Sequence, residues 1–466
     1  TYPTDTVVKL IVVLNFVLYT ILLIAFLNDG AQFDLARHGV DFAFQVVITA
    51  ITYYVALAIY LVKHQRNGRL LIDPYNMFLF LFSIPNLSQD FYRFIWDGRM
   101  ILEGFNPYLY TPESFIINGV SPIYQAQELY NGMGILNASH FTNYPPLNQL
   151  CFVIAGLFAG KNILGSVIVL RLIIIAADFG TLYFGKKLLD KLNIPVNAIF
   201  WFILNPFIII ELTGNLHFES VMIFFLIWSL YLFKIGKWRF TSLVFACSIS
   251  IKLIPLIFLP LFFNWFFHDK FSIKNWKLHF LESKKLFVFY SIIIMVSLIL
   301  FMPFYNLEFL QNYAQTVALW FQDFEFNASF YYLARIVGYQ FTGYNEIGVI
   351  GKVIPIIILI FVLYTSFFRN NKTLKDLITN MLIVLSFYFF MSTTVHPWYI
   401  ATLLILSIFT KYKFPLVWSF AAILSYLAYA NSNNTENLWI IGLEYTIVYG
   451  FLIWEVFIKK ATKLVA

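Results

Sequence analysis

Long apolar stretches separated by short polar turns make up most of the chain. A helix needs about 20 apolar residues to span a membrane. We assign spans to residues 7–27, 41–63, 71–87, 163–188, 195–213, 219–234, 286–304, 348–368, 377–395, 397–410, 413–430 and 437–457, with two short helices in 239–267. The pattern predicts an all-α polytopic membrane protein with about 14 transmembrane helices, in a single integral membrane domain over residues 1–466.

Two longer polar regions interrupt the apolar pattern, at residues 88–160 and 305–346. The first contains amphipathic pieces and then the apolar residues 147–160, which are too few to cross a membrane and are expected to form a juxtamembrane helix. Pro145 and Pro146 precede this piece, and proline favours the first turn of a helix. We expect a large first outer loop that carries juxtamembrane helices, and a second outer loop.

Basic residues indicate the side of the membrane on which each loop lies. Lys and Arg cluster in short loops such as Lys63–Arg69 and 268–285, and the positive-inside rule places such loops in the cytoplasm. Both ends of the chain are then inside, and the two longer polar regions are outside. Residues 7–27 lack a small-residue cleavage site, so we expect a membrane anchor and not a removed signal peptide.

The composition supports the membrane assignment and excludes other classes. Hydrophobic residues make up 60% of the chain and charged residues 12%, whereas about a quarter of the residues of a soluble domain are charged. The net charge of +7 comes from the basic loops, so it does not indicate nucleic-acid binding. Cys151 and Cys247 both lie in apolar segments and indicate neither a disulfide framework nor a metal site.

Ionisable residues gather in the first outer loop, in a helix predicted over 91–102. Asp90 directly follows a membrane-like segment, where charged groups are costly and usually functional. We interpret it as a general base that accepts a proton from an acceptor hydroxyl; the alternative is a helix N-cap. Arg93 lies one turn further on the same face. It either clamps a phosphate or forms a structural salt bridge with Asp90 or Asp97.

The same topology brings other polar residues to the outer side. Lys252 stands in an apolar run and cannot remain unpaired, so it either snorkels or binds an anionic phosphate. His217 and Glu219 form a weak metal pattern or a polar cap on two helix ends, and a divalent cation stays open as a cofactor. The predicted donor phosphate and sugar site comprises Arg93, Asp97, Tyr144, His217, Glu219, Lys252 and His396.

The first outer loop also carries a family resemblance. The segment SQDFYRFIWDGRMILEGFNPYLY (88–110), followed by NYPPLNQ, resembles the first outer loop of bacterial GT-C glycosyltransferases, with mannosyltransferase-like proteins as the nearest group. RLIIIAADFGTLYF, GNLHFES, SIKLIPLIFLP and HPWYI follow in the same order, so the resemblance covers residues 75–400. It implies a GT-C-like fold, a catalytic carboxylate at Asp90, and an active-site floor of juxtamembrane helices within 91–160.

The resemblance implies a glycosyltransferase that uses polyprenyl-phosphate sugars. The expected reaction transfers a hexose, mannose for the nearest group, to a hydroxyl of a glycan, lipid or protein acceptor. One direct displacement inverts the anomeric centre. The expected location is the bacterial inner membrane, with the active site facing the periplasm.

A transporter or flippase for a lipid-linked glycan is the alternative function, because it also needs outer cations and a lipid groove. Such proteins usually show an internal repeat and a polar path at mid-membrane. This chain shows no repeat, and its clear midspan charges are Arg171, Asp178 and Glu211. A non-catalytic lipid-binding subunit ranks third, since the ionisable cluster in 90–103 argues against it.

Overall fold

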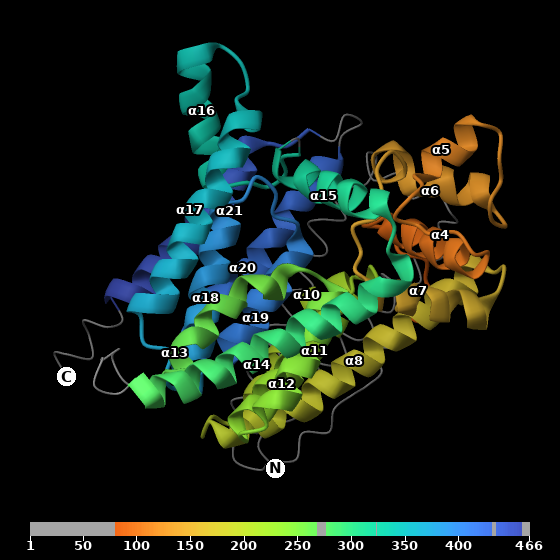
Figure 1. Cartoon of the computed structure of the whole chain (residues 1–466). Coiled ribbons are helices and arrows are strands. Elements are labelled where there is room, and N and C mark those ends of the chain that lie inside the picture. The colour runs from red at the N-terminus through yellow and green to blue at the C-terminus, as the bar shows by residue number, and fades with distance from the viewer. Residues whose placement is uncertain (1–79, 268–275, 323, 431–434, 459–466) are drawn as a thin grey trace, which may run out of the picture.

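A computed structural model describes residues 80–267, 276–322, 324–430 and 435–458 of the protein (Figure 1). Within these ranges the chain is helical, apart from an isolated parallel bridge between Phe326 and Thr394. The all-α prediction is therefore confirmed for the described part. The predicted spans 7–27 and 41–63 lie outside the described residues, as does most of 71–87.

The helices follow the predicted segments closely. The region 88–160, predicted as the first outer loop, holds α4 (Asp90–Leu102), α5 (Pro112–Ile117), α6 (Ala126–Ala138) and α7 (Pro146–Ala159). Next come α8 (Ile163–Lys191), η1 (Val196–Ile199), α9 (Phe200–Ile203), α10 (Pro206–Ile208), η2 (Ile209–Gly214), α11 (Glu219–Lys234), α12 (Trp238–Ile251), η3 (Ile254–Phe262), α13 (Phe263–Phe266), α14 (Trp276–Phe301) and η5 (Met302–Phe304).

The second half of the chain continues this helical arrangement. It contains α15 (Leu307–Gln322), α16 (Phe330–Thr342), α17 (Ile347–Phe368), α18 (Leu374–Met391), η6 (Pro397–Tyr399), α19 (Ile400–Ile408), α20 (Phe414–Ala421), η7 (Ala422–Ala430), α21 (Leu438–Ile453) and η8 (Trp454–Ile458). Figure 1 shows α4 to α7 gathered at one side of the molecule and α17, α18 and α21 at the other. The long helices α8 and α14 run between these two groups.

Five described helical segments are long and apolar enough to cross a membrane, at Ile163–Lys191, Ser283–Phe304, Ile347–Phe368, Leu374–Met391 and Leu438–Ile458. The pair Val196–Ile203 and Pro206–Gly214 adds a sixth if it is one span, but its halves are bent by 50°. The segment predicted as a span over 195–213 is therefore broken into two helical pieces, and its crossing of the membrane as one span stays a prediction. The break falls where Pro206 interrupts the helix and Asn205 accepts a hydrogen bond from the Phe207 amide at 3.0 Å. The count of about 14 spans is not confirmed and stays a prediction.

A buried arginine fixes the end of this broken segment. Arg171 of α8 donates hydrogen bonds to the carbonyl oxygens of Thr213 at 2.9 Å, Gly214 at 3.0 Å and Leu81 at 3.0 Å. Carbonyls at the end of a helix lack helical partners and need such donors. The contacts hold the turn after η2, and with it the residues that begin α11, against α8.

Helices α4 and α7 pack closely enough to require a glycine. A Cβ atom added at Gly98 of α4 would lie 2.3 Å from the carbonyl oxygen of Phe152 in α7. The ring of Phe94, one turn earlier, stacks on the ring of Phe152 with centroids 4.6 Å apart. The two helices therefore form one packed layer beneath the residues at the start of α4.

We expect Gly98→Ala to destabilise the protein by about 1–3 kcal/mol, the usual range for overpacking. The added methyl group meets a backbone atom, so the two helices must move apart. Thermal unfolding of the purified protein in detergent measures the effect. Gly442→Ala in α21 is the control, because its added Cβ would meet nothing within 4 Å. Equal unfolding temperatures for the two variants would contradict the prediction.

Candidate functional site

A cavity of about 1010 Å³ lies between the region 88–160 and the helices η3, α17 and α18. Neutral polar side chains from residues 88–143 line part of it, at Ser88, Gln89, Asn137, His140 and Asn143. Apolar side chains of η3 and α17 line another part, at Leu256, Ile257, Ile358, Leu359 and Val362. Asp90 and Lys252 also line this cavity, so the predicted base and the predicted phosphate-binding cation belong to the same site.

Asp90 is the first residue of α4 and contacts a side chain from α6. The N-cap position is Gln89, and no side chain forms a capping hydrogen bond there. The interpretation of Asp90 as an N-cap is therefore wrong. Its Oδ1 atom accepts a hydrogen bond from Nδ2 of Asn137 at 3.2 Å. Burial raises the pKa of the Asp90 carboxyl, whereas the charge of Lys252 and the bond from Asn137 lower it. A carboxylate with a raised pKa suits a general base.

Arg93 and Asp97 form the salt bridge that the sequence offered as an alternative. Nε of Arg93 lies 2.8 Å from Oδ1 of Asp97, and both side chains are buried. Nη1 of Arg93 donates to the carbonyl oxygens of Asn137 at 2.5 Å and His140 at 3.0 Å. The remaining Nη2 atom has no hydrogen-bond partner among the described residues. Phosphate binding by Arg93 stays a prediction.

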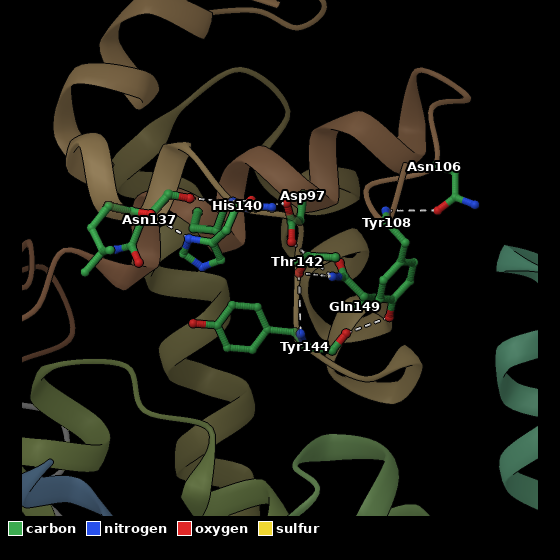
Figure 2. Close-up of polar contacts among 10 residues, drawn as sticks. Asp97, Asn106, Tyr108, Asn137, His140, Thr142, Tyr144 and Gln149 are labelled. Carbon is green, nitrogen blue, oxygen red and sulfur yellow. Dashed lines mark hydrogen bonds and ion pairs between the residues drawn. The ribbon is translucent and has the colours of Figure 1, made fainter. Parts of the chain in front are cut away.

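Asp97 and Tyr144 belong to a hydrogen-bonded network between α4 and α7 (Figure 2). Nε2 of Gln149 donates to Oδ2 of Asp97 at 3.0 Å and to Oγ1 of Thr142 at 3.0 Å. The hydroxyl of Tyr108 donates to the carbonyl oxygen of Tyr144 at 2.6 Å. Tyr144 lines the cavity, whereas Asp97 is fully buried beneath it. The network fixes the chain that leads into α7.

Lys252 forms an ion pair that the sequence analysis did not identify. Its Nζ atom lies 2.5 Å from Oε1 of Glu219, and its side chain is 17% exposed. Lys252 is the C-cap of α12 and lies two residues before η3, whose apolar residues line the same cavity. Glu219, the first residue of α11, is completely buried. Lys252 therefore lines the cavity next to the apolar residues that follow it along the chain.

The two predicted histidines both stack on Trp398. The centroid of the Trp398 ring lies 3.8 Å from that of His217 and 4.4 Å from that of His396. Burial, with the nearby charge of Lys252, lowers the pKa of His396 to about 3 and that of His217 well below its ordinary value. Both imidazoles are therefore neutral at pH 7. His396 lines the cavity together with Trp398.

Metal binding was left open by the sequence. The structure, over the residues it describes, places no group of three or more His, Cys, Asp or Glu side chains where they could hold a metal ion. A divalent cation stays open as a cofactor.

Asn137 is a cavity residue that sequence reasoning did not assign to the site. It lies 47 positions from Asp90, and its one motif, an Asn-x-Ser triplet, is too common to indicate a site. The one signal nearby is Gly134, which has a φ of +75° inside α6, a conformation that favours glycine. Such a kink redirects the last turn of a helix, but the sequence does not say toward which residue.

Known proteins similar to this chain are mannosyltransferases. The profile of the family described as "Alpha-(1->6)-mannopyranosyltransferase, N-terminal domain" matches residues 35–268, which is half of the chain. The alpha-(1->6)-mannopyranosyltransferase A of Mycobacterium tuberculosis is 23% identical over 189 residues, or 40% of this chain and 34% of the relative. Its counterpart from Corynebacterium glutamicum is 26% identical over 188 residues, or 39% and 35%.

The matched stretch spans about a third of the length of both relatives. The family match begins before the first described helix and includes α4, α7, α11 and Lys252. It confirms the resemblance to GT-C enzymes that the first outer loop indicated. On the strength of the profile match, the chain belongs to the alpha-(1->6)-mannopyranosyltransferase family.

Proposed function

We propose that the protein is a GT-C glycosyltransferase that transfers mannose from a polyprenyl-phosphate donor to an acceptor hydroxyl, with inversion. The observation that carries the proposal is one cavity in which Asp90, Lys252 and an apolar groove lie together. Family membership supports the enzyme class. The names of the two relatives support mannose and an α-(1→6) linkage.

The apolar part of the cavity suits the lipid chain of such a donor. It is lined by Ile254, Leu256, Ile257 and Pro260 of η3 and by Ile358 and Leu359 of α17, and burying a hydrocarbon chain there contributes about 0.8 kcal/mol per CH₂. Lys252 precedes these η3 residues along the chain and lines the same cavity. A lipid with its tail in the groove would bring its phosphate to the ammonium group, a charge-assisted contact.

The reaction follows from these two positions. Asp90 removes the proton from the acceptor hydroxyl as that oxygen attacks the anomeric carbon of the donor sugar. The bond from this carbon to the phosphate oxygen breaks, and the lipid phosphate leaves with the electron pair. Lys252 stabilises the charge that develops on the phosphate, and the neutral His396 is a candidate hydrogen-bond donor. The attack comes from the side opposite the leaving group, which inverts the anomeric centre.

The same proposal includes the placement of the enzyme in the membrane. Residues 88–160 and 305–346 are its two outer loops, in a single membrane domain of about 14 spans. The site faces the periplasmic side of a bacterial inner membrane. The positive-inside distribution of Lys and Arg supports this orientation.

The test is sugar transfer by the purified full-length protein in lipid nanodiscs. The probes are synthetic polyprenyl-phosphate mannose with a radiolabelled sugar and an alkyl α-mannoside as acceptor. We expect a labelled disaccharide with an α-(1→6) linkage. Donor binding without transfer, combined with movement of the lipid between leaflets, would favour the transporter alternative and overturn the proposal. A chelator arm shows whether a divalent cation is required.

Filling the groove should weaken donor binding selectively. Leu359→Trp places a large ring in the cavity, and we expect the KM for a long-chain donor to rise at least about tenfold, since several buried CH₂ groups are displaced. The control is Ile360→Trp, on the next residue of α17, which is exposed to a similar degree (62% against 54% for Leu359) but does not line the cavity. A donor with a short lipid chain should be used equally well by both variants. Equal KM values for the long-chain donor would contradict the groove assignment.

A further inference from the structure

The carboxylate of Asp90 is held from α6. The contact is the hydrogen bond from Nδ2 of Asn137 to Oδ1 of Asp90, at 3.2 Å. Both residues line the same cavity. An amide donor on one oxygen fixes the rotation of the carboxylate and leaves the lone pairs of Oδ2 for another partner. A general base needs this kind of fixed orientation, because proton transfer depends on the position of the accepting oxygen.

A kink in the backbone of α6 places Asn137 next to Asp90. Gly134 has φ +75° and ψ +163°, so the residues after it form a separate final turn. The side chain of Gln89 fills the space beside Gly134, where an added Cβ would lie 2.9 Å from its Nε2 atom. Any other residue at position 134 would be strained and would push against Gln89. The kink and the contact with Gln89 direct the turn that carries Asn137 toward the start of α4.

Arg93 then fixes that turn. Its Nη1 atom donates to the carbonyl oxygens of Asn137 at 2.5 Å and His140 at 3.0 Å, and its Nε atom is paired with Asp97 at 2.8 Å. Arg93 as a whole is 3% exposed. Arg93 thus links Asp97 in its own helix to the backbone of the residue that holds Asp90.

We propose that Asn137 is a positioning residue for the base Asp90, and that Arg93 acts on the reaction through Asn137 and not through the donor phosphate. This inference rests on the proposed function. It assigns a role to a residue outside the predicted site and gives Arg93 a role different from phosphate binding. The hydrogen bond from Asn137 stabilises the charged form of Asp90, as Lys252 does by its charge.

Several other groups influence the charge of Asp90. On its own helix are Arg93 and Asp97, which are paired with each other. The titratable and charged groups contributed by the surrounding elements are His140, Tyr144, Glu219, Lys252, Tyr388, His396 and Tyr399. The substitution at position 137 leaves all of these groups in place, so a change in the ionisation of Asp90 in Asn137→Ala can be assigned to the lost contact. Arg93→Met also removes a nearby positive charge, so that variant is judged by the KM for the donor and by its non-additivity with Asn137→Ala.

The first test is the pH profile of kcat/KM for transfer from polyprenyl-phosphate mannose by Asn137→Ala. Asp90 must be charged to act as a base. Losing the hydrogen bond raises its pKa, so the acidic limb of the profile moves to higher pH. At pH 7 we expect kcat/KM to fall by about tenfold to a hundredfold, the value of one hydrogen bond to a charged group. Asn137→Ser, which keeps a donor, should restore part of the loss.

The matched control is Asn131→Ala, on the same helix. Asn131 is exposed and bonded to Gln127 at 3.0 Å, away from the cavity. It should leave the pH profile unchanged. Retained donor binding shows that each variant is folded. An acidic limb of Asn137→Ala that coincides with that of wild type would overturn the role of Asn137.

A double-mutant cycle tests the second half of the inference. Arg93→Met should move the acidic limb in the same direction as Asn137→Ala, with little change in the KM for the donor. The double variant should lose little more kcat/KM than Asn137→Ala alone, because the effects of two residues that act through one contact are not additive. If Arg93 binds the phosphate directly, Arg93→Met raises the KM for the donor and leaves the acidic limb in place. Its loss of kcat/KM then adds in full to that of Asn137→Ala. This result would overturn the proposed role of Arg93.

A measurement without turnover separates this inference from the proposed function. Infrared titration follows the protonated carboxyl band of Asp90, identified by its absence in Asp90→Asn. If the wild-type protein transfers no sugar, the proposed function fails, yet the titration still compares Asp90 in wild type and Asn137→Ala. A higher pKa in the variant supports the positioning contact, and an unchanged pKa overturns it.

Discussion

Asp90→Asn should abolish sugar transfer while leaving donor binding intact. The substitution keeps the size of the side chain and removes the proton acceptor, and general-base catalysis contributes about a hundredfold to ten-thousandfold. We expect kcat for mannose transfer to fall by that factor and the affinity for polyprenyl-phosphate mannose to stay within a few-fold of wild type. Labelled transfer and equilibrium binding in nanodiscs measure the two quantities separately.

The control for this prediction is Glu103→Gln. Glu103 ends the same helix and is exposed, so the change removes one carboxylate from α4 without touching the cavity. Its activity should match wild type. Full transfer by Asp90→Asn would show that the base lies elsewhere.

The pH dependence of sugar transfer by the wild-type protein provides a related prediction. The pKa of Asp90 is raised by burial, and the base acts only when it is charged. Transfer should therefore decline as the pH falls through this raised pKa, above the range of an ordinary aspartate. No such limb should remain in the residual activity of Asp90→Asn.

The hydropathy pattern predicted helices well but not how one of them breaks. Residues 219–234 were assigned as a span, and α11 runs over Glu219–Lys234. Over 195–213 the apolar pattern is equally continuous, yet the helix bends by 50° at Asn205 and Pro206. Hydropathy reports burial in lipid or protein and is insensitive to a bend. The proline was the local signal, because it cannot continue the hydrogen-bond ladder.

The site was predictable only where a residue is unusual in its own local sequence. Asp90 and Lys252 stand out because they are charged at the edge of apolar segments, and both line the cavity. Their partners, Asn137 and Glu219, lie 47 and 33 positions away. Such pairs depend on how helices pack, and one sequence without related sequences contains no information on which distant residues meet.

Lys252→Met is the second substitution with a large expected effect, and it should act in two separable ways. It removes a cation that lines the cavity, so kcat should fall about a hundredfold to a thousandfold, as for other groups that stabilise developing charge. It also leaves Glu219 buried without its partner, which should cost about 3 kcal/mol of stability. Transfer assays and thermal unfolding in detergent report the two effects.

The double variant Lys252→Met, Glu219→Gln separates catalysis from stability. Replacing the buried carboxylate by an amide removes the unpaired charge, so the unfolding temperature should return toward that of wild type. Transfer should not return, because the phosphate still lacks its cation. Recovery of both properties together would mean that Lys252 serves only to neutralise Glu219, and the developing charge on the phosphate would then need another partner. Recovery of stability alone would show that the ammonium group serves the reaction itself and not only the neutralisation of Glu219.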